Sequence, residues 1–218
     1  TFFCVVGVIG CLPLLQVNQL VQVIRDVIFV PMGVADASSH FWFDFFAGIV
    51  LVMLVGTVIF GGISRIADVS SRVVPAMVIL YMACALWVII VNLSEVPQYL
   101  ALIVSDAFTG DAAAGGLVGV VIATGVRRAA FSNEAGIGTE SMAHGAAKTR
   151  EPVREGLVAM MEPVIDTLIV CTCTALVILM TGVWQTSSDS GVTLTATAFE
   201  SAMPGLGSYL LIICVIFF

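Results

Sequence analysis

The stretch RRAAFSNEAGIGTESMAHGAAKTREPVR, residues 127–154, is a polar segment between two strongly apolar runs. Five of the eight basic residues of the chain lie in it: Arg127, Arg128, Lys148, Arg150 and Arg154. Short loops that are rich in lysine and arginine remain on the cytoplasmic side of membrane helices. The sequence therefore predicts that residues 127–155 form a cytoplasmic loop, which fixes the orientation of the neighbouring segments.

The composition of the chain is typical of a membrane protein. Of its 218 residues, 60% are hydrophobic and 11% are charged, and the mean hydropathy is +1.11, whereas soluble domains contain about 25% charged residues. Several apolar runs approach the ~20 residues that a helix needs to cross the hydrocarbon core. A membrane β-barrel would instead show alternating segments of ~10 residues. We therefore predict an all-α polytopic membrane protein.

Six membrane spans are predicted, at residues 1–24, 41–63, 74–92, 112–126, 156–183 and 204–218. They are predicted to form one transmembrane domain over residues 1–218. Because both ends of the sequence lie inside apolar runs, we expect these residues to be an internal piece of a longer protein. Seven of the eight basic residues fall in the connections 64–73 and 127–155, which are therefore both expected in the cytoplasm. Residues 96–108 are expected to lie at the membrane interface, and residues 184–203, rich in Ser, Thr and Gly, to form an extracellular loop.

Metal, nucleic-acid and enzymatic functions are not indicated by the sequence. The six cysteines lie in apolar runs, and Cys171 and Cys173 have no further cysteine or histidine at ligand spacing, so free buried thiols are expected. His144 also lacks a metal partner at ligand spacing and is expected to be solvated or to cap a helix. No basic patch is interleaved with aromatic residues, as nucleic-acid binding would require. Neither a G-x-S-x-G motif nor a phosphate-binding loop is present, so we do not expect an enzyme.

The span 112–126 opens with the glycine-rich sequence AAAGGLVG, residues 112–119. Each glycine costs a continuous helix about 1 kcal/mol relative to alanine, and a membrane tolerates a broken helix only where the backbone faces protein or a polar cavity. Transporters use such breaks to direct free backbone groups at substrate and ions. Small residues that permit close helix packing would produce the same pattern, so both interpretations remain open.

The span 1–24 contains polar amides, of which Gln16 and Gln19 share one helix face. Buried amides are costly unless they form hydrogen bonds. Gln16 is therefore a candidate for the polar wall of a site that binds a small zwitterionic molecule. Hydrogen bonding between helices is the alternative role for these side chains.

Acidic residues mark a second candidate region. Glu162 and Asp166 are four residues apart and therefore on one helix face, and Asp166 lies about one turn deeper in the span 156–183. An acid at depth marks an ion or proton path, or pairs with a base or a backbone group. In the polar segment, Asn133 and Glu134 are placed either to cap a helix or to close a gate with Arg127 or Arg128.

Several motifs match one family of transporters. The longest is Arg128–Gly138, with the sequence RAAFSNEAGIG, and the others are dispersed along the chain: Gly61–Ile66, Gly115–Gly116, Pro152–Arg154 and Asp166–Thr167. On these motifs the chain resembles the sodium:alanine (alanine/glycine:cation) symporter family over almost its whole length. The resemblance implies a leucine-transporter-like fold with two inverted five-helix repeats, of which the six spans would be the third to eighth helices.

The same resemblance implies a function in the cell membrane. The protein would be a secondary transporter that couples Na⁺ to the uptake of alanine or glycine by alternating access, without an organic cofactor. A proton-coupled carrier, and a channel-like or inactive membrane fragment, are the alternatives. No sodium ligand is assigned, because the resemblance places the sodium site largely on helices outside these residues. The expected partners are a small neutral amino acid and the lipid bilayer.

The resemblance also assigns roles to individual positions. Gln16 and the break at Gly115, Gly116 and Leu117 match family positions that contact substrate, and Gly119 of the same open backbone is expected beside them. The residues expected in a gate or ion path, from the charges and the depth described above, are Arg128, Asn133, Glu134 and Asp166. The chain departs from the family pattern around Gln16, since Leu12-Pro13 replaces Gly-Asn and Val17-Asn18-Gln19 replaces Ala-Asn-Ser. These departures allow a larger or differently shaped amino acid as substrate.

Overall fold

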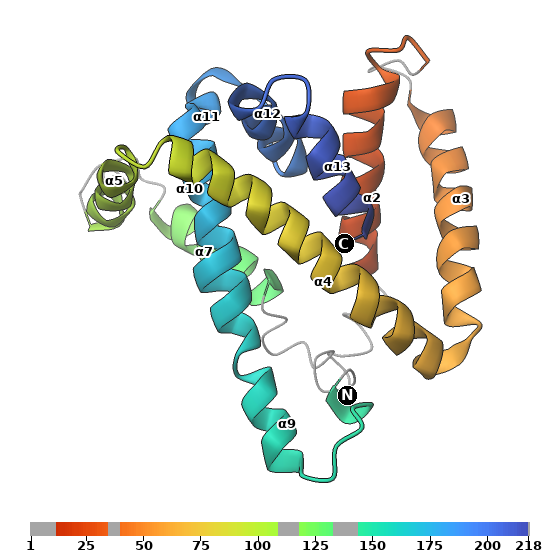
Figure 1. The fold of residues 1–218 in the computed structure, drawn as a ribbon. Coiled ribbons are helices and arrows are strands. Elements are labelled where there is room, and N and C mark those ends of the chain that lie inside the picture. Colours follow the sequence, from red (N-terminus) through yellow and green to blue (C-terminus); the bar gives the residue numbers. More distant parts are fainter. Residues whose placement is uncertain (1–11, 35–39, 109–117, 133–143, 218) are drawn as a thin grey trace. The chain divides into compact units, whose positions relative to one another are not determined.

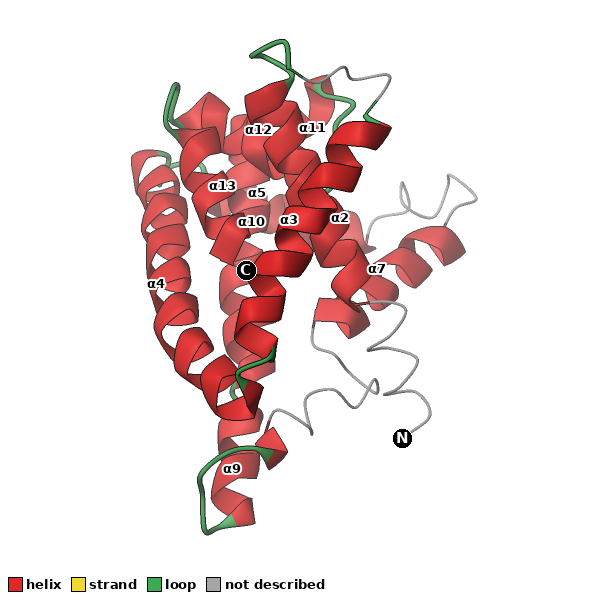
Figure 2. Cartoon of the chain, turned by 90° about the vertical axis from the view of Figure 1, so that its right-hand side faces the viewer, coloured by secondary structure: helices red, strands yellow, loops and turns green. Residues whose placement is uncertain are grey.

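The structure, a computed structural model, describes residues 12–34, 40–108, 118–132 and 144–217. Every regular element in these residues is helical (Figure 2). The α-helices are α2 (Leu12–Ile24), α3 (Phe41–Ile59), α4 (Gly62–Val91), α5 (Val96–Phe108), α7 (Val118–Ser132), α9 (Pro152–Ala159), α10 (Thr172–Thr181), α11 (Val183–Thr186), α12 (Val192–Ala202) and α13 (Gly207–Phe217), and the π-helical segments are η1 (Arg25–Phe29) and η2 (Val164–Cys171). The predicted all-helical class is thus confirmed for the described residues.

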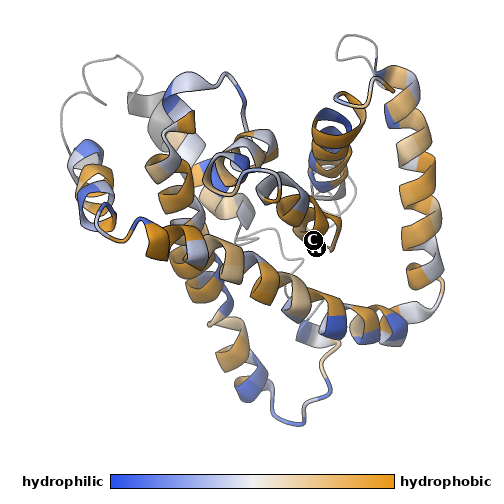
Figure 3. Cartoon of the chain, turned by 45° about the horizontal axis from the view of Figure 1, so that its top comes forward, coloured by the Kyte–Doolittle hydropathy of each residue, from blue (hydrophilic) through white to orange (hydrophobic). Residues whose placement is uncertain are grey.

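Three helical stretches among the described residues are long and apolar enough to cross a membrane: Phe41–Ile59, Gly62–Val91 and Pro152–Thr181. A shorter apolar helix, α13, covers Gly207–Phe217. Figure 3 shows that α3 is hydrophobic along most of its length. These lengths and compositions agree with a membrane-embedded protein.

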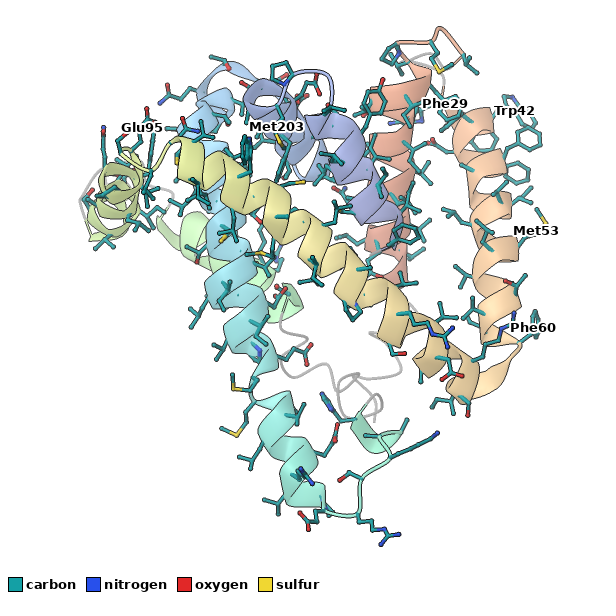
Figure 4. All side chains as sticks on the ribbon, in the orientation of Figure 1. Phe29, Trp42, Met53, Phe60, Glu95 and Met203 are labelled. Carbon is teal, nitrogen blue, oxygen red and sulfur yellow. The ribbon has the colours of Figure 1, made fainter. Side chains whose placement is uncertain are left out.

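The surface of α3 is apolar on nearly all sides. No residue of this helix is buried, and Trp42, Met53 and Phe60 point away from α2 (Figure 4). A helix that is hydrophobic all round belongs either in a protein core or in a membrane. Since no residue of α3 is fully buried and most of its large apolar side chains are exposed, its outer surface fits a lipid environment.

The chain forms two compact units, which have separate sets of internal contacts. One unit contains Ile89–Met180, and the other combines Leu12–Val88 with Thr181–Phe218. In the second unit, α12 packs against α2 and α13, and α3 lies beside α2 (Figure 1). In the first unit, α7 packs against η2.

The core of the second unit is built around α12. Phe199 of α12 and Val23 of α2 are fully buried. The Phe199 ring also lies 5.8 Å from the Tyr81 ring of α4, so a third helix contacts the same residue. Burial of large apolar side chains of this kind contributes about 1.5–3 kcal/mol each.

The extracellular loop predicted at residues 184–203 was wrong in its secondary structure, because α11 and α12 occupy most of this stretch. Its Ser- and Thr-rich composition is typical of a loop, but two of the threonine hydroxyls of α12 donate to carbonyls one turn earlier. Thr197 Oγ1 donates to the Thr193 carbonyl at 3.0 Å, and Thr195 Oγ1 donates to the Gly191 carbonyl at 3.3 Å. The buried Thr193 Oγ1 has no hydrogen-bond partner among the described residues. Ala196 and Phe199 of the same helix are buried.

Two further segments predicted as loops are also helical. Residues 64–73 form the first part of α4, which continues past Pro75, and residues 127–132 form the last turns of α7. Charged side chains do not end a helix once it has left the hydrocarbon core. A 30-residue helix such as α4 is about 45 Å long, longer than the ~30 Å core, so a polar end projects beyond it. The side of the membrane on which these segments lie remains a prediction.

The start of α13 is fixed by a carboxylate from α12. Glu200 accepts hydrogen bonds from the backbone N–H of Gly205 at 2.7 Å, and from the N–H and hydroxyl of Ser208 at 3.2 and 2.5 Å. Gly205 adopts φ +83°, a left-handed conformation that side chains other than glycine rarely adopt. Because the N–H groups of the first helical turn lack intrahelical partners, Glu200 stabilises this end of α13.

Replacing Glu200 by glutamine is expected to lower the thermal stability of the protein at neutral pH. Hydrogen bonds from the Ser208 hydroxyl and from the N–H groups of Gly205 and Ser208 lower the pKa of the Glu200 carboxyl below its ordinary value. The ionised carboxylate therefore stabilises the folded state above the ordinary value of about 4.3, and this stability is lost as the pH falls through the lower folded pKa. Thermal unfolding in detergent should give a higher melting temperature for the wild type than for Glu200→Gln at pH 7, and equal melting temperatures at pH 3. A higher wild-type melting temperature at pH 3 would contradict this role.

Candidate functional site

The two glutamines that share a face of α2 have different environments. Gln19 Oε1 accepts a hydrogen bond from the Val192 N–H at 3.1 Å, at the first residue of α12, and Gln19 Nε2 donates to Gln22 Oε1 at 3.5 Å. Gln16 is exposed on the same helix. Gln19 therefore forms a hydrogen bond between helices, which was the alternative role for both glutamines. The Gln16 amide stays accessible to a ligand.

Gly191 explains why α2 and α12 can approach each other at Gln19. The residue has φ +65°, and a Cβ atom there would lie 2.7 Å from Gln19 Oε1. Only glycine combines this backbone conformation with the space for the amide. The hydrogen bond from the Val192 N–H to Gln19 Oε1 therefore depends on the residue that precedes Val192.

A hollow of about 300 Å³ lies in the second unit and is lined by α2, η1 and α3: Leu14, Val17, Asn18, Val21, Gln22, Arg25, Asp44 and Gly48. Its volume lies at the lower end of the range of small-molecule pockets, about 300–1,000 Å³. Half of these eight residues are apolar, and the other half are two amides, one arginine and one aspartate. The hollow can therefore hold an apolar group with a polar end.

The charged lining of the hollow is a paired network. Arg25 Nη1 donates to both carboxylate oxygens of Asp44 at 2.8 and 3.0 Å, and Arg25 Nε donates to Asp26 at 3.0 Å. His40 Nδ1 lies 2.9 Å from Asp44 Oδ2. This network was not predicted from the sequence. Its signal was Asp44, a single acid in the apolar span 41–63, because a charge in such a segment needs a partner.

In the first unit, α7 and η2 are joined through Asp166. The Ser132 hydroxyl, at the end of α7, donates to Asp166 Oδ2 in η2. Asp166 is half-buried, and Arg128 is exposed one turn before Ser132 on α7. The partner of Asp166 is thus a hydroxyl of the polar segment, where the sequence had suggested an ion, a base or a backbone group.

Asp166 lies in the first turn of a π-helical segment that begins directly after Pro163. Proline has no N–H to donate and disturbs the regular ladder of hydrogen bonds in a helix. π-helical turns leave backbone groups less regularly bonded and are frequent at functional sites. The position of Asp166 therefore fits a role in a gate or ion path.

Other predicted site residues are only partly covered by the structure. Gly115, Gly116, Leu117, Asn133 and Glu134 lie outside the described residues. Gly119 lies in the first turn of α7, which begins at Val118, directly after the glycine-rich stretch. The break proposed for residues 112–119 is thus followed by a regular helix.

His144 lies between two carboxylates, which was not predicted. Its Nδ1 lies 2.8 Å from Glu155 Oε1, and its Nε2 lies 3.7 Å from Glu162 Oε2. Within the described residues, no group of three or more His, Cys, Asp or Glu side chains is arranged to hold a metal. Glu155 and Glu162 are seven residues apart, so they share a helix face, and this spacing was the signal in the sequence.

The chain is similar to known transporters. The model of the sodium:alanine symporter family matches residues 1–218. A putative sodium/proton-dependent alanine carrier protein of Bacillus subtilis is 40% identical over 80% of the chain and 39% of its own length. A probable sodium/glutamine symporter of the same organism is 40% identical over 78% and 36%, and a sodium/alanine symporter of Methanococcus maripaludis is 38% identical over 85% and 42%. The chain thus spans about two fifths of the length of these relatives.

Proposed function

The chain belongs to the sodium:alanine symporter family, and from this premise we propose that the protein couples the inward movement of Na⁺ to uptake of a small neutral amino acid, alanine or glycine. The observation that carries the proposal is the family match over residues 1–218. Long apolar helices, which a membrane transporter requires, support it. Because the chain spans two fifths of its relatives, the activity is proposed for the full-length protein.

We propose a topology with six spans in the cell membrane and with the connections 64–73 and 127–155 in the cytoplasm. The fold would be the leucine-transporter-like arrangement of two inverted five-helix repeats, with these spans as the third to eighth helices. The distribution of basic residues supports the orientation. Transport would proceed by alternating access around a site near the midplane.

The substrate and the coupling ion have specific alternatives. One relative is named a sodium/proton-dependent alanine carrier and another a sodium/glutamine symporter. The residues around Gln16 differ from the family pattern, which favours testing glutamine beside alanine and glycine. Proton coupling is the second candidate for the driving ion.

We propose that Gln16, Gly115, Gly116, Leu117 and Gly119 bind substrate. We propose that Arg128, Asn133, Glu134 and Asp166 belong to a gate or ion path. The exposure of Gln16 on α2 supports its availability to substrate. The Ser132–Asp166 hydrogen bond supports the gate, since it ties the polar segment to η2. Loss of such a tie would free α7 from η2 during the transport cycle.

The proposed function is tested with the full-length protein in proteoliposomes. Uptake of labelled alanine, glycine and glutamine is measured with a Na⁺ gradient alone, with a pH gradient alone and with neither. We expect uptake only with the Na⁺ gradient, and competition by the preferred amino acid. Equal uptake with the pH gradient alone would overturn sodium coupling and favour the proton-coupled carrier.

Replacing Gln16 by alanine is expected to raise the KM for the amino acid about tenfold, because one hydrogen bond to substrate is worth up to about 1.5 kcal/mol. The thermal stability should stay at the wild-type value, since the side chain is exposed. Gln19→Ala is the matched comparison on the same face, and it should lower the melting temperature while leaving KM unchanged. A wild-type KM in Gln16→Ala would remove Gln16 from the proposed site.

A further inference from the structure

His144 lies beside two carboxylates in the first unit. Glu155 belongs to α9, and Glu162 follows the end of α9 at Ala159. The two carboxylate oxygens lie at opposite ring nitrogens, 2.8 Å from Nδ1 and 3.7 Å from Nε2. The side chains are partly shielded, with 27% of His144 and 23% of Glu155 exposed. The ring therefore has an acceptor on each side.

This geometry distinguishes the protonation states of the ring. A neutral imidazole has one N–H donor and one acceptor nitrogen, whereas an imidazolium donates from both nitrogens. Glu155 lies at hydrogen-bond distance from Nδ1, whereas Glu162, at 3.7 Å from Nε2, attracts the ring through its charge when both nitrogens are protonated. With the neutral ring, one carboxylate would face the lone pair of an unprotonated nitrogen, which repels it.

The surrounding charges also favour the imidazolium form of the ring. Opposite charges within about 4–6 Å stabilise the charged form of a titrating group, and both carboxylates fall within that range. The other charged residues of this stretch, Lys148, Arg150 and Arg154, are exposed. Their charges, like that of the exposed Glu151, are screened by solvent, whereas Glu155 and Glu162 lie within 4 Å of the ring.

We propose that His144, Glu155 and Glu162 form a proton-binding site, and that a proton bound there fastens the chain at His144 onto α9. When the proton leaves, the ring can keep its hydrogen bond to Glu155, but it loses the charge attraction to both carboxylates, and the attachment weakens. Histidine changes charge between pH 5 and 8, so the attachment would respond to pH in the physiological range. The site lies outside the proposed substrate and gate residues, and this inference does not depend on the proposed symport.

The test follows the titration of His144 by NMR, in full-length protein labelled with ¹⁵N-histidine and reconstituted in nanodiscs. The signal of His144 is identified by its loss in His144→Gln. We expect the titration midpoint to fall by about one pH unit in Glu155→Gln and by less in Glu162→Gln, since the second oxygen is farther away. Glu151→Gln is the matched control, because Glu151 is exposed at the start of α9 and should leave the midpoint unchanged.

The outcomes of this titration are distinct. A lower midpoint in Glu155→Gln or Glu162→Gln, together with a wild-type midpoint in Glu151→Gln, supports the site. An unchanged midpoint in both variants, or an equal shift in the control, overturns it. Glu162→Gln keeps the test decisive if Glu155→Gln does not fold, because Glu162 is about half exposed.

A second measurement tests the attachment itself. Trypsin can cut after Lys148 and Arg150, which are exposed between His144 and α9. At pH 6 the wild-type protein should be cut about tenfold more slowly than His144→Gln, and at pH 8.5 the two rates should be equal. Equal rates at both pH values would refute the attachment. Neither measurement requires transport, so a protein that moves no amino acid would still test this site.

Discussion

Replacement of Gly207 by alanine is expected to be the most damaging single-methyl change in the second unit. Gly207 is buried at the first residue of α13, where α13 packs against α12. A Cβ atom there would lie 2.0 Å from the Phe199 carbonyl oxygen, 2.3 Å from its carbonyl carbon and 2.8 Å from the Glu200 nitrogen. These are backbone atoms, which cannot rotate away as a flexible side chain would.

The clash forces the two helices apart at the residue that anchors the core. Overpacking of a core costs about 1–3 kcal/mol, and separation of α13 from α12 would also disturb the buried Phe199 and the Glu200 cap. We therefore expect a clearly lower melting temperature and less folded protein in fluorescence-detected size-exclusion chromatography. Gly125→Ala in α7 is the control, because nothing lies within 4 Å of the position that its new methyl group would occupy. Equal stability of the two variants would show that α12 and α13 are not in close contact.

Replacement of Asp166 by alanine is expected to reduce amino-acid uptake about 10- to 100-fold. The change removes a charge-assisted hydrogen bond, worth about 1.5–3 kcal/mol, between η2 and Ser132 of α7. It also removes the acid that we propose for the gate or ion path. Initial rates of labelled alanine uptake at limiting and saturating Na⁺ measure the effect, with protein amounts matched by quantitative blotting.

Two further variants separate the roles of Asp166. Ser132→Ala removes the hydrogen bond and keeps the acid, while Asp166→Asn keeps a hydrogen-bonding side chain and removes the charge. If Asp166 acts only by joining α7 to η2, Ser132→Ala should match Asp166→Ala. If it lies on an ion path, Asp166→Asn should be the more severe change and should raise the Na⁺ concentration for half-maximal uptake. Asp106→Ala, at an exposed position of α5, is the control, and wild-type uptake in Asp166→Ala would exclude both roles.

Hydrophobic length and composition predicted the helical membrane class well, because a bilayer imposes one simple requirement on each span. The same criteria failed at residues 184–203, where a polar composition suggested a loop. In α12 the Thr197 hydroxyl donates to a carbonyl of its own helix, so a polar residue is compatible with a helix whose other face is buried around Phe199. Composition does not record where a hydroxyl points.

The sequence predicted single candidate residues of the site, but it did not predict contacts between residues that are distant in the sequence. Asp166 was singled out as an acid at depth, but its partner Ser132 lies 34 residues away. Arg25 and Asp44 are 19 residues apart, and the sequence gives no register between their helices. Gln19 was distinguishable from Gln16 only once α12 was seen to donate its first N–H group to it.

The π-helical turn at η2 has a mechanical consequence. A helix turns by about 100° for each residue, and a π-helical turn differs from an α-helical one by a shift of one residue in its hydrogen-bond register. Conversion of η2 to α-helix would therefore rotate Asp166 by up to about 100° about the helix axis, away from the Ser132 hydroxyl, while the flanking α10 kept its own turns. Such a change would be a rotation about the helix axis. It would let the stretch Pro152–Thr181 change its contact with α7 without bending.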